Sequence, residues 1–166
     1  MRLTYYGHSC FSVNASGKNL LFDPYISSNE LAKHIDLKKI PADYILLSHG
    51  HIDHIEDCEK IAKNTKATAI CAYEVSEWLC KKGVESTHPM NHGGKWNFEF
   101  GTVKTVNAVH SSVMPDGTYG GNPMGFIVST EEKKFYYSGD TALTMDMQLV
   151  PRWGQLDFAV LPIGDN

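Results

Sequence analysis

The chain has 166 residues, of which 42% are hydrophobic and 20% are charged, so it can bury a core and lacks the composition of disordered or fibrous proteins. Its formal net charge of −4 comes from interspersed acids and bases, without a run of Lys or Arg that would suit a phosphate backbone. No apolar signal segment follows Met1, and no stretch is apolar over the length needed to span a bilayer. We therefore expect one cytoplasmic domain over residues 1–166, with no membrane partner and with nucleic acid disfavoured as a partner.

The first 24 residues predict an antiparallel meander of three short strands. Turn-forming residues at 7–9 and 14–17 separate the strand-like runs, and Pro24 ends the third run. The expected strands are Leu3–Tyr6, Cys10–Val13 and Asn19–Phe22. A weak helix is expected to follow over Ser28–Lys39.

The middle of the chain alternates between strand and helix patterns. Tyr44–Leu47 is a short continuous apolar run, which is typical of a strand buried on both faces. The elements expected after it are a helix over Glu56–Lys63, a strand over Thr68–Cys71 and a helix over Val75–Lys82 that Gly83 ends. This alternation indicates an α/β fold.

The last part of the chain returns to strand patterns. The expected strands are Trp96–Phe100, Val103–Val109, Gly125–Ser129, Phe135–Tyr137 and Phe158–Leu161. A short helix over Met145–Val150, ended by Pro151, is expected before the last of them.

The four cysteines are widely spaced and form no C-x-x-C pair, which disfavours a zinc knuckle or a disulfide framework. We expect Cys10, Cys58, Cys71 and Cys80 to fill the core as free thiols in a reducing compartment.

The most informative segment is Ser48-His49-Gly50-His51-Ile52-Asp53-His54, directly after the buried apolar run. Four metal-competent side chains lie within six residues there, and they converge if the loop curls at Gly50. Neutral imidazoles and a carboxylate suit zinc, and they also suit manganese or iron. A solvated loop with a chance excess of histidine is the alternative, but this window holds three of the eight histidines.

The arrangement of His49, His51, Asp53 and His54 resembles the signature of the metallo-β-lactamase superfamily, and His110 and Asp140 match later motifs in order. More narrowly, the segments at 5–11, 22–24 and 115–123 look like those of uncharacterised bacterial metal-dependent hydrolases related to ascorbate-6-phosphate lactonase. The resemblance covers residues 1–166. It implies an α/β sandwich of two mixed sheets with outer helices, and a dinuclear metal site at one edge between the sheets.

The resemblance also assigns the ligands of two metal ions, most readily zinc. His49, His51 and His110 would hold the first ion, Asp53 and His54 the second, and Asp140 would be shared. A water held between two cations ionises near neutral pH and becomes the nucleophile. Family members normally continue beyond the strand that ends near Leu161 and supply a further histidine, so we expect this chain to be truncated at its C-terminus and its second site to be the weaker one.

Other polar residues have two interpretations each. His8, in a turn between strands, is expected to point into the cleft, where it and Asp53 are the candidate catalytic residues; the alternative is a surface histidine. Asp23 could orient a ligand imidazole or simply open the Asp-Pro turn. His88 and His92 are expected in a solvated loop, and His34 on a solvated helical face.

The segment 111–123 is a long irregular stretch beside the proposed metals, so it is a candidate substrate lid; a plain connecting loop is the alternative. Met114, Tyr119 and Asn122 are its expected substrate-binding residues.

The function expected from these patterns is hydrolysis of a small, anionic ester, lactone or phosphodiester by a metal-bound hydroxide. A nuclease or RNA-processing phosphodiesterase is the alternative within catalysis, although the acidic net charge disfavours it. A non-catalytic metal-binding domain is the alternative outside catalysis, and a homo-oligomer is left open.

Overall fold

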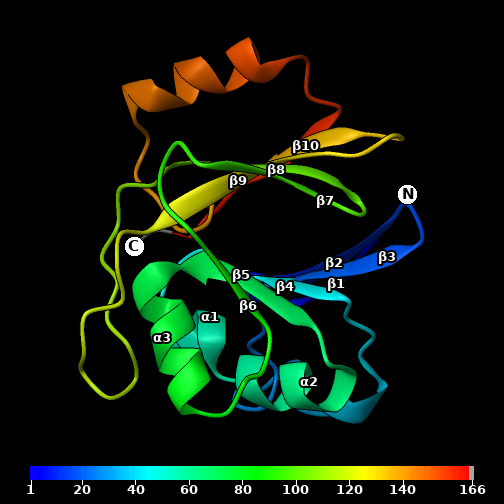
Figure 1. Ribbon diagram of the computed structural model, residues 1–166, viewed down its shortest axis with the longest axis vertical. Helices are drawn as coiled ribbons and strands as arrows, with labels where there is room; N and C mark the ends of the chain where they lie inside the picture. Colours follow the sequence, from blue (N-terminus) through cyan, green and yellow to red (C-terminus); the bar gives the residue numbers. More distant parts are fainter. Residues whose placement is uncertain (165–166) are drawn as a thin grey trace.

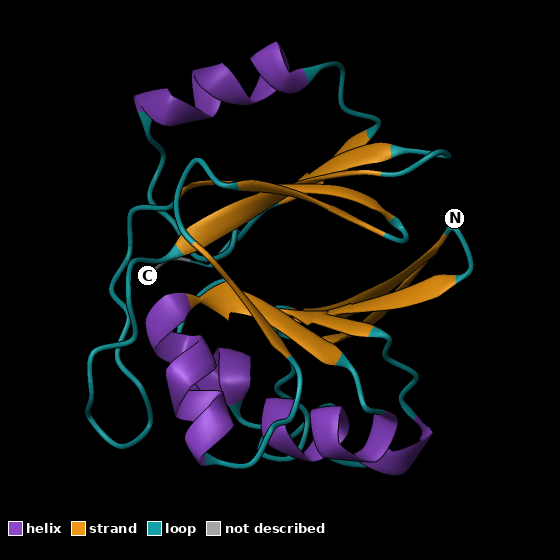
Figure 2. Cartoon of the chain, in the orientation of Figure 1, coloured by secondary structure: helices purple, strands orange, loops and turns teal. Residues whose placement is uncertain are grey.

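The computed structural model, which describes residues 1–164, is a sandwich of two β-sheets with helices on the outer faces (Figure 2). The α-helices of the described residues cover the outer side of one sheet, and a long 3₁₀-helix lies over the other sheet (Figure 2). The expected α/β architecture of two mixed sheets is therefore confirmed.

The first sheet contains six strands that lie side by side in sequence order (Figure 1). They are β1 (Arg2–Gly7), β2 (Cys10–Ala15), β3 (Lys18–Phe22), β4 (Tyr44–Leu46), β5 (Thr68–Ala72) and β6 (Thr87–Met90). β1 to β3 pair antiparallel through tight turns, whereas β3 to β6 pair parallel and need longer crossovers. Those crossovers contain η1 (Leu37–Lys39), α1 (Ile52–Ile55), α2 (Cys58–Thr65) and α3 (Tyr73–Lys81).

The second sheet contains five strands in the order β11-β10-β9-β8-β7. They are β7 (Lys95–Phe98), β8 (Gly101–Asn107), β9 (Met124–Ser129), β10 (Lys134–Tyr137) and β11 (Phe158–Val160). Neighbours are antiparallel except β10 and β11, which η2 (Met145–Trp153) connects in parallel. Every strand expected from the sequence is present, and its ends differ from the expected ones by at most two residues.

Aromatic side chains from both sheets meet in the core. Phe11 of β2 stacks on Phe22 of β3 with ring centroids 4.4 Å apart. Tyr137 of β10 packs edge-on against both rings, at 5.0 and 5.5 Å. All three side chains are at most 3% exposed, so this contact fixes the end of β10 against the first sheet.

The weak helix expected over Ser28–Lys39 is wrong, because only Leu37–Lys39 is helical and it forms a single 3₁₀ turn. The side chain of Asn29 accepts a hydrogen bond from the N–H of Leu31, and the N–H of Ile35 donates to the carbonyl of Ala32 three residues before it. Such local bonds offer the backbone an alternative to a helix.

Strand β6 was not expected, because it contains Pro89. Proline cannot donate to a ladder, but β6 is an edge strand, where a missing N–H is tolerated. His88 therefore lies in a strand, with its ring 5.0 Å from that of Trp96 and 4.9 Å from that of Phe98, and the solvated-loop interpretation of His88 is wrong.

The helix expected to end before Pro151 instead continues to Trp153 as the 3₁₀-helix η2. The fixed φ of proline is compatible with a 3₁₀ turn. No helix within residues 1–164 is long and apolar enough to cross a membrane.

Three of the four cysteines are buried free thiols, as expected. Burial raises the pKa of Cys10 to about 12, so this thiol stays protonated. Cys80 is exposed near the end of α3, so the core interpretation is wrong for that residue.

Candidate metal centre

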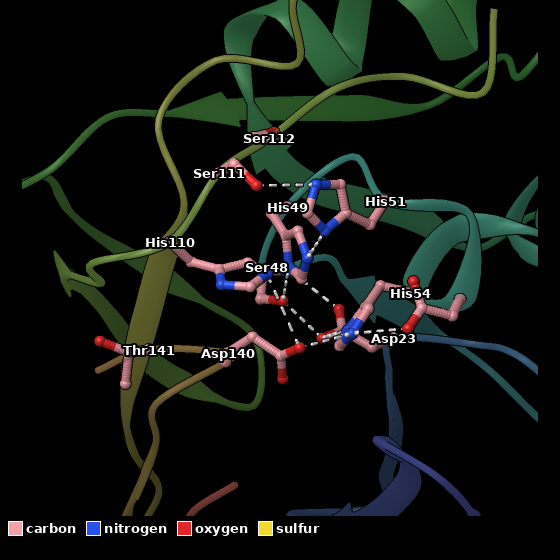
Figure 3. A network of polar contacts seen from close by, with 12 residues as sticks. Asp23, Ser48, His49, His51, His54, His110, Ser111, Ser112, Asp140 and Thr141 are labelled. Atoms are coloured by element: carbon pink, nitrogen blue, oxygen red, sulfur yellow. Dashed lines mark hydrogen bonds and ion pairs between the residues drawn. The ribbon is translucent and has the colours of Figure 1, made fainter. Parts of the chain in front are cut away.

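Side chains from four segments that are far apart in sequence meet at one edge of the sandwich. Figure 3 shows three of these segments, represented by His49, His110 and Asp140. His8 lies in the β1–β2 turn, residues 49–54 follow β4, His110 follows β8 and Asp140 follows β10. Each lies beyond the end of a strand, where the backbone leaves the ladder and can direct a side chain between the sheets. Because β4 and β10 belong to different sheets, the site forms only when the sheets pack together.

His49, His51 and His110 form the first group of donors. Nε2 of His49 lies 2.9 Å from Nδ1 of His51, and the ring of His110 has its centroid 5.0 Å from those of the other two rings. One ring nitrogen from each residue lies within 4.8 Å of the others. The structure thus brings together the three imidazoles that the resemblance assigned to the first ion.

Ser48 sets the tautomer of His49. Its hydroxyl lies 2.9 Å from His49 Nδ1 and donates to Asp23 Oδ2 at 2.5 Å. Because the hydroxyl proton is used on Asp23, Ser48 accepts from His49, which places the imidazole proton on Nδ1. Nε2 of His49 is then left with a free lone pair facing His51.

Asp23 is a fully buried carboxylate that orients the ring of His54 through its Nδ1 atom. It accepts hydrogen bonds from His54 Nδ1 at 2.8 Å, from the Ser48 N–H at 2.8 Å and from the Tyr137 hydroxyl. Of its two interpretations, the structure supports the carboxylate that orients an imidazole. His54 Nε2 is consequently directed into the cluster, fully buried and without a hydrogen-bond partner among residues 1–164.

The remaining donors surround that nitrogen. Asp140 Oδ2 lies 3.2 Å from His54 Nε2 and 3.9 Å from His110 Nε2, which places Asp140 between the two groups. Asp53 Oδ2 lies 3.8 Å from His54 Nε2 and 2.9 Å from His8 Nε2. His8, Asp53, His54 and Asp140 are hereafter the second cluster, and the three imidazoles above are the first cluster.

The two clusters have opposite electrostatics. Burial, with a smaller contribution from the neighbouring rings of His54 and His51, lowers the pKa of His49 to about 2. Burial also disfavours a charged His54, but the carboxylates of Asp23 and Asp140 outweigh it and raise the pKa of His54 to about 10. The contact with His54 Nε2, 3.2 Å away, lowers the pKa of Asp140 to about 2. Burial also lowers the pKa of His51, so His49 and His51 of the first cluster favour the neutral form, whereas the second cluster is built around carboxylates.

These residues fit divalent metal ions. A buried imidazole nitrogen without a partner normally costs stability, and a bound cation would satisfy it. Three imidazoles in one cluster and mixed imidazole and carboxylate donors in the other are ligand sets that zinc and related ions take.

An open cavity of about 840 Å³ adjoins the centre, and its wall includes His8, His110 and Asp140. Tyr5 from the first sheet and Val160 from the second line other parts of it. No Lys or Arg belongs to the part of this wall that residues 1–164 form.

The expected substrate contacts of segment 111–123 lie elsewhere. Met114 is only 2% exposed and packs in the core, so it offers little surface here, and its assignment as a substrate contact stays a prediction. A Cβ at Gly50 would lie 2.5 Å from Met114 Sδ, so glycine is needed there for close approach rather than for a positive φ. Tyr119 is 63% exposed and bonded to Asn122, and the cavity wall includes neither residue; their substrate role stays a prediction.

Three polar residues of the centre were not found from the sequence. Ser48 and Ser111 each adjoin a proposed ligand in the chain, and that adjacency was the available signal. Ser111 Oγ lies 3.2 Å from the outer nitrogen, Nε2, of His51. Tyr137 gave no signal, because it lies in an apolar strand of the other sheet.

Comparison with known proteins agrees with this geometry. A family model described as a β-lactamase superfamily domain matches residues 18–165. A UPF0173 metal-dependent hydrolase of Flavobacterium johnsoniae is 53% identical over the whole chain, which covers 73% of that relative. The UPF0173 metal-dependent hydrolase YtkL of Bacillus subtilis is 42% identical, again over the whole chain, which covers 74% of YtkL.

A solved structure shares the fold as well. Igni18, a metallo hydrolase from Ignicoccus hospitalis, superposes with a TM-score of 0.85 at 32% identity, over 99% of this chain and 71% of Igni18. Whole-chain identity at this level, together with two clusters of metal donors at the sheet edge, shows that the chain belongs to the metallo-β-lactamase superfamily and, within it, to the UPF0173 metal-dependent hydrolases.

Proposed function

We propose that this chain hydrolyses a small, anionic ester, lactone or phosphodiester at a centre of two metal ions, with zinc as the first candidate. The observation that carries the proposal is the position of Asp140, whose Oδ2 lies between the two clusters beside an open cavity. A pair of neighbouring donor sets with a shared carboxylate suits a substrate held across two cations.

The protein's own groups prepare the ligands before any ion binds. Asp23 and the Ser48 hydroxyl keep protons on the outer Nδ1 atoms of His54 and His49, so the inner Nε2 atoms face the clusters. Nε2 of His49 presents a lone pair, and Nε2 of His54 presents one when a metal ion displaces its proton. Among the described residues the cavity wall includes apolar side chains and no Lys or Arg, and bound metal ions would attract a substrate anion there. When bound, divalent ions supply Lewis acidity and a water that ionises near neutral pH.

The test couples metal analysis to hydrolysis. Metal content of the purified protein would be measured, and rates on generic aryl esters, lactones and phosphodiesters compared before and after treatment with a chelator. We expect the rate to vanish on chelation and to return when zinc or manganese is added. The variant His51→Ala should lose metal and rate, and His34→Ala, which changes an exposed histidine outside both clusters, should lose neither.

The outcomes separate the alternatives. A rate that survives removal of metal would contradict the proposal. Metal bound without hydrolysis of any substrate class would indicate the non-catalytic metal-binding domain, and a preference for RNA or DNA over small phosphodiesters would indicate the nuclease.

A further inference from the structure

His8 is held in an unusual backbone conformation. It lies in the β1–β2 turn with φ +52°, in the left-handed region that few non-glycine residues adopt, directly after Gly7 with φ +119°. The Tyr5 hydroxyl donates to the His8 carbonyl at 2.9 Å, which supports this turn. Non-glycine residues persist in that region where the surrounding structure requires them, which is common at ligand-binding sites.

The turn directs the His8 ring into the second cluster. Nε2 lies 2.9 Å from Asp53 Oδ2, and the ring packs edge-on against His54 at 5.4 Å and against Tyr25 at 5.5 Å. One donor atom each from His8, Asp53 and His54 lies within 4.8 Å of the other two. The His8 side chain is 40% exposed, on the side of the cluster that borders the cavity.

A short contact between donor atoms has a precedent in the first cluster. There, His49 Nε2 and His51 Nδ1 are also 2.9 Å apart, and both are inner nitrogens of the three-imidazole group. The contact between His8 and Asp53 therefore has the spacing of two donors that face one position. It does not require that His8 serve only as a hydrogen-bond donor to Asp53.

The buried nitrogen of His54 points in the same direction. Asp53 Oδ2 lies 3.8 Å and Asp140 Oδ2 3.2 Å from His54 Nε2. This Nε2 has no hydrogen-bond partner among the described residues, which marks the position that these donors surround. We propose that His8 is a ligand of the second metal ion, beside the imidazole of His54 and the carboxylates of Asp53 and Asp140.

This inference rests on the proposed two-metal centre but not on the identity of the substrate. It gives the residue of the β1–β2 turn a definite role, and it makes the second ion depend on a segment that is distant in sequence from the H-x-H-x-D-H motif. Since His8 is the most exposed imidazole of the cluster, the ion would remain accessible from the cavity.

The test uses the full chain loaded with an NMR-active cadmium isotope and carrying isotope-labelled histidine rings. Scalar coupling between cadmium and a ring nitrogen passes through a metal–ligand bond, so it counts the ligands directly. We expect coupling from His49, His51 and His110 to one cadmium, and from His54 and His8 to the other. A His8 ring that shows no coupling, while His54 is coupled, would overturn the proposal.

A variant adds a thermodynamic measurement. His8→Asn suits the turn, because asparagine tolerates a left-handed φ, but its side chain is too short to replace the imidazole. It should weaken binding of the second cadmium by more than about 100-fold, beyond the roughly 10–100-fold range of changes to groups that only support a ligand. Binding of the first cadmium should not change, and His34→Asn, at an exposed histidine outside both clusters, should change neither.

The two proposals fail separately. Two cadmium ions coupled as expected in a protein that hydrolyses nothing would remove the proposed function and keep the assignment of His8. Metal-dependent hydrolysis with an uncoupled His8 ring, or a smaller loss of affinity in His8→Asn, would do the reverse.

Discussion

The first and second clusters both contact the buried carboxylate of Asp23, but His49 of the first cluster and His54 of the second differ in their pKa. In the first cluster, Asp23 reaches His49 only through the neutral hydroxyl of Ser48, and burial keeps the pKa of His49 near 2. In the second cluster, Asp23 bonds directly to His54, and the pKa of His54 rises to about 10.

That difference teaches how one residue can serve two sites. The Ser48 hydroxyl, which lies between Asp23 and His49, fixes the tautomer of His49 without placing a negative charge beside its ring, because the hydroxyl is neutral. The direct contact of the Asp23 carboxylate with His54 both orients the His54 ring and favours its charged form. Burial thus keeps His49 of the first cluster neutral, whereas the second cluster is built around carboxylates, and Asp140 Oδ2 lies within 4 Å of a ring nitrogen of each cluster.

The largest expected effect comes from removing that connection. Asp140→Ala should reduce hydrolysis by about a thousandfold, or about 4 kcal/mol of transition-state stabilisation, because both clusters lose a shared donor. Steady-state rates on the best generic substrate would measure it. Asp146→Ala, an exposed carboxylate outside both clusters, is the matched control. An Asp140→Ala rate within about tenfold of the parent would show that the clusters do not depend on this residue.

The next effect tests whether Asp23 supports both halves. Asp23→Asn keeps the shape but loses the charge that the Ser48 hydroxyl, His54 and Tyr137 all contact. The metal-free protein should lose about 3 kcal/mol in its free energy of unfolding, because several buried donors lose an anionic acceptor. Urea unfolding measures this loss, and chelator competition should show both metal ions bound more weakly.

Tyr137→Phe is the control for Asp23→Asn, since it removes one donor and leaves the carboxylate. It should cost about 1 kcal/mol and leave metal affinity nearly unchanged. If Asp23→Asn weakened only the second ion, the relay through Ser48 would have no energetic role in the first cluster.

The sequence predicted the strands well because their signals are local. Continuous apolar runs and alternating patterns identified every strand except β6, in which Pro89 hid an edge strand. The helix expected over Ser28–Lys39 failed because Asn29 forms local bonds that a hydrophobic pattern does not reveal. Elements were therefore lost where a single residue's side-chain or backbone chemistry overrode the periodicity.

The donors of the site were predictable to the extent that they are contiguous. The spacing of the donors within residues 49–54 predicts a metal site by itself. His110 and Asp140 were assigned by resemblance, because no sequence pattern near them connects them to that segment. The network around Asp23 could not be predicted, since Tyr137 comes from the other sheet, 114 residues away. Met114 is buried against Gly50, and apolar character beside a site does not distinguish a substrate contact from a residue that supports the loop of residues 49–54.

The last predictions concern metal affinity in variants of two serines whose hydroxyls contact the outer ring nitrogens of His49 and His51. Ser48 is buried and bonds His49 at 2.9 Å, whereas Ser111 is exposed and lies 3.2 Å from His51 Nε2. Ser48→Ala should weaken binding of the first metal ion roughly 10–100-fold, because no water can replace a hydroxyl that also donates to the buried Asp23. Ser111→Ala should weaken binding of the same ion by less than about tenfold, since water can reach His51 and take the place of the hydroxyl. Chelator competition on the two variants measures the pair, and equal losses would show that burial does not decide how strongly a supporting hydroxyl affects this centre.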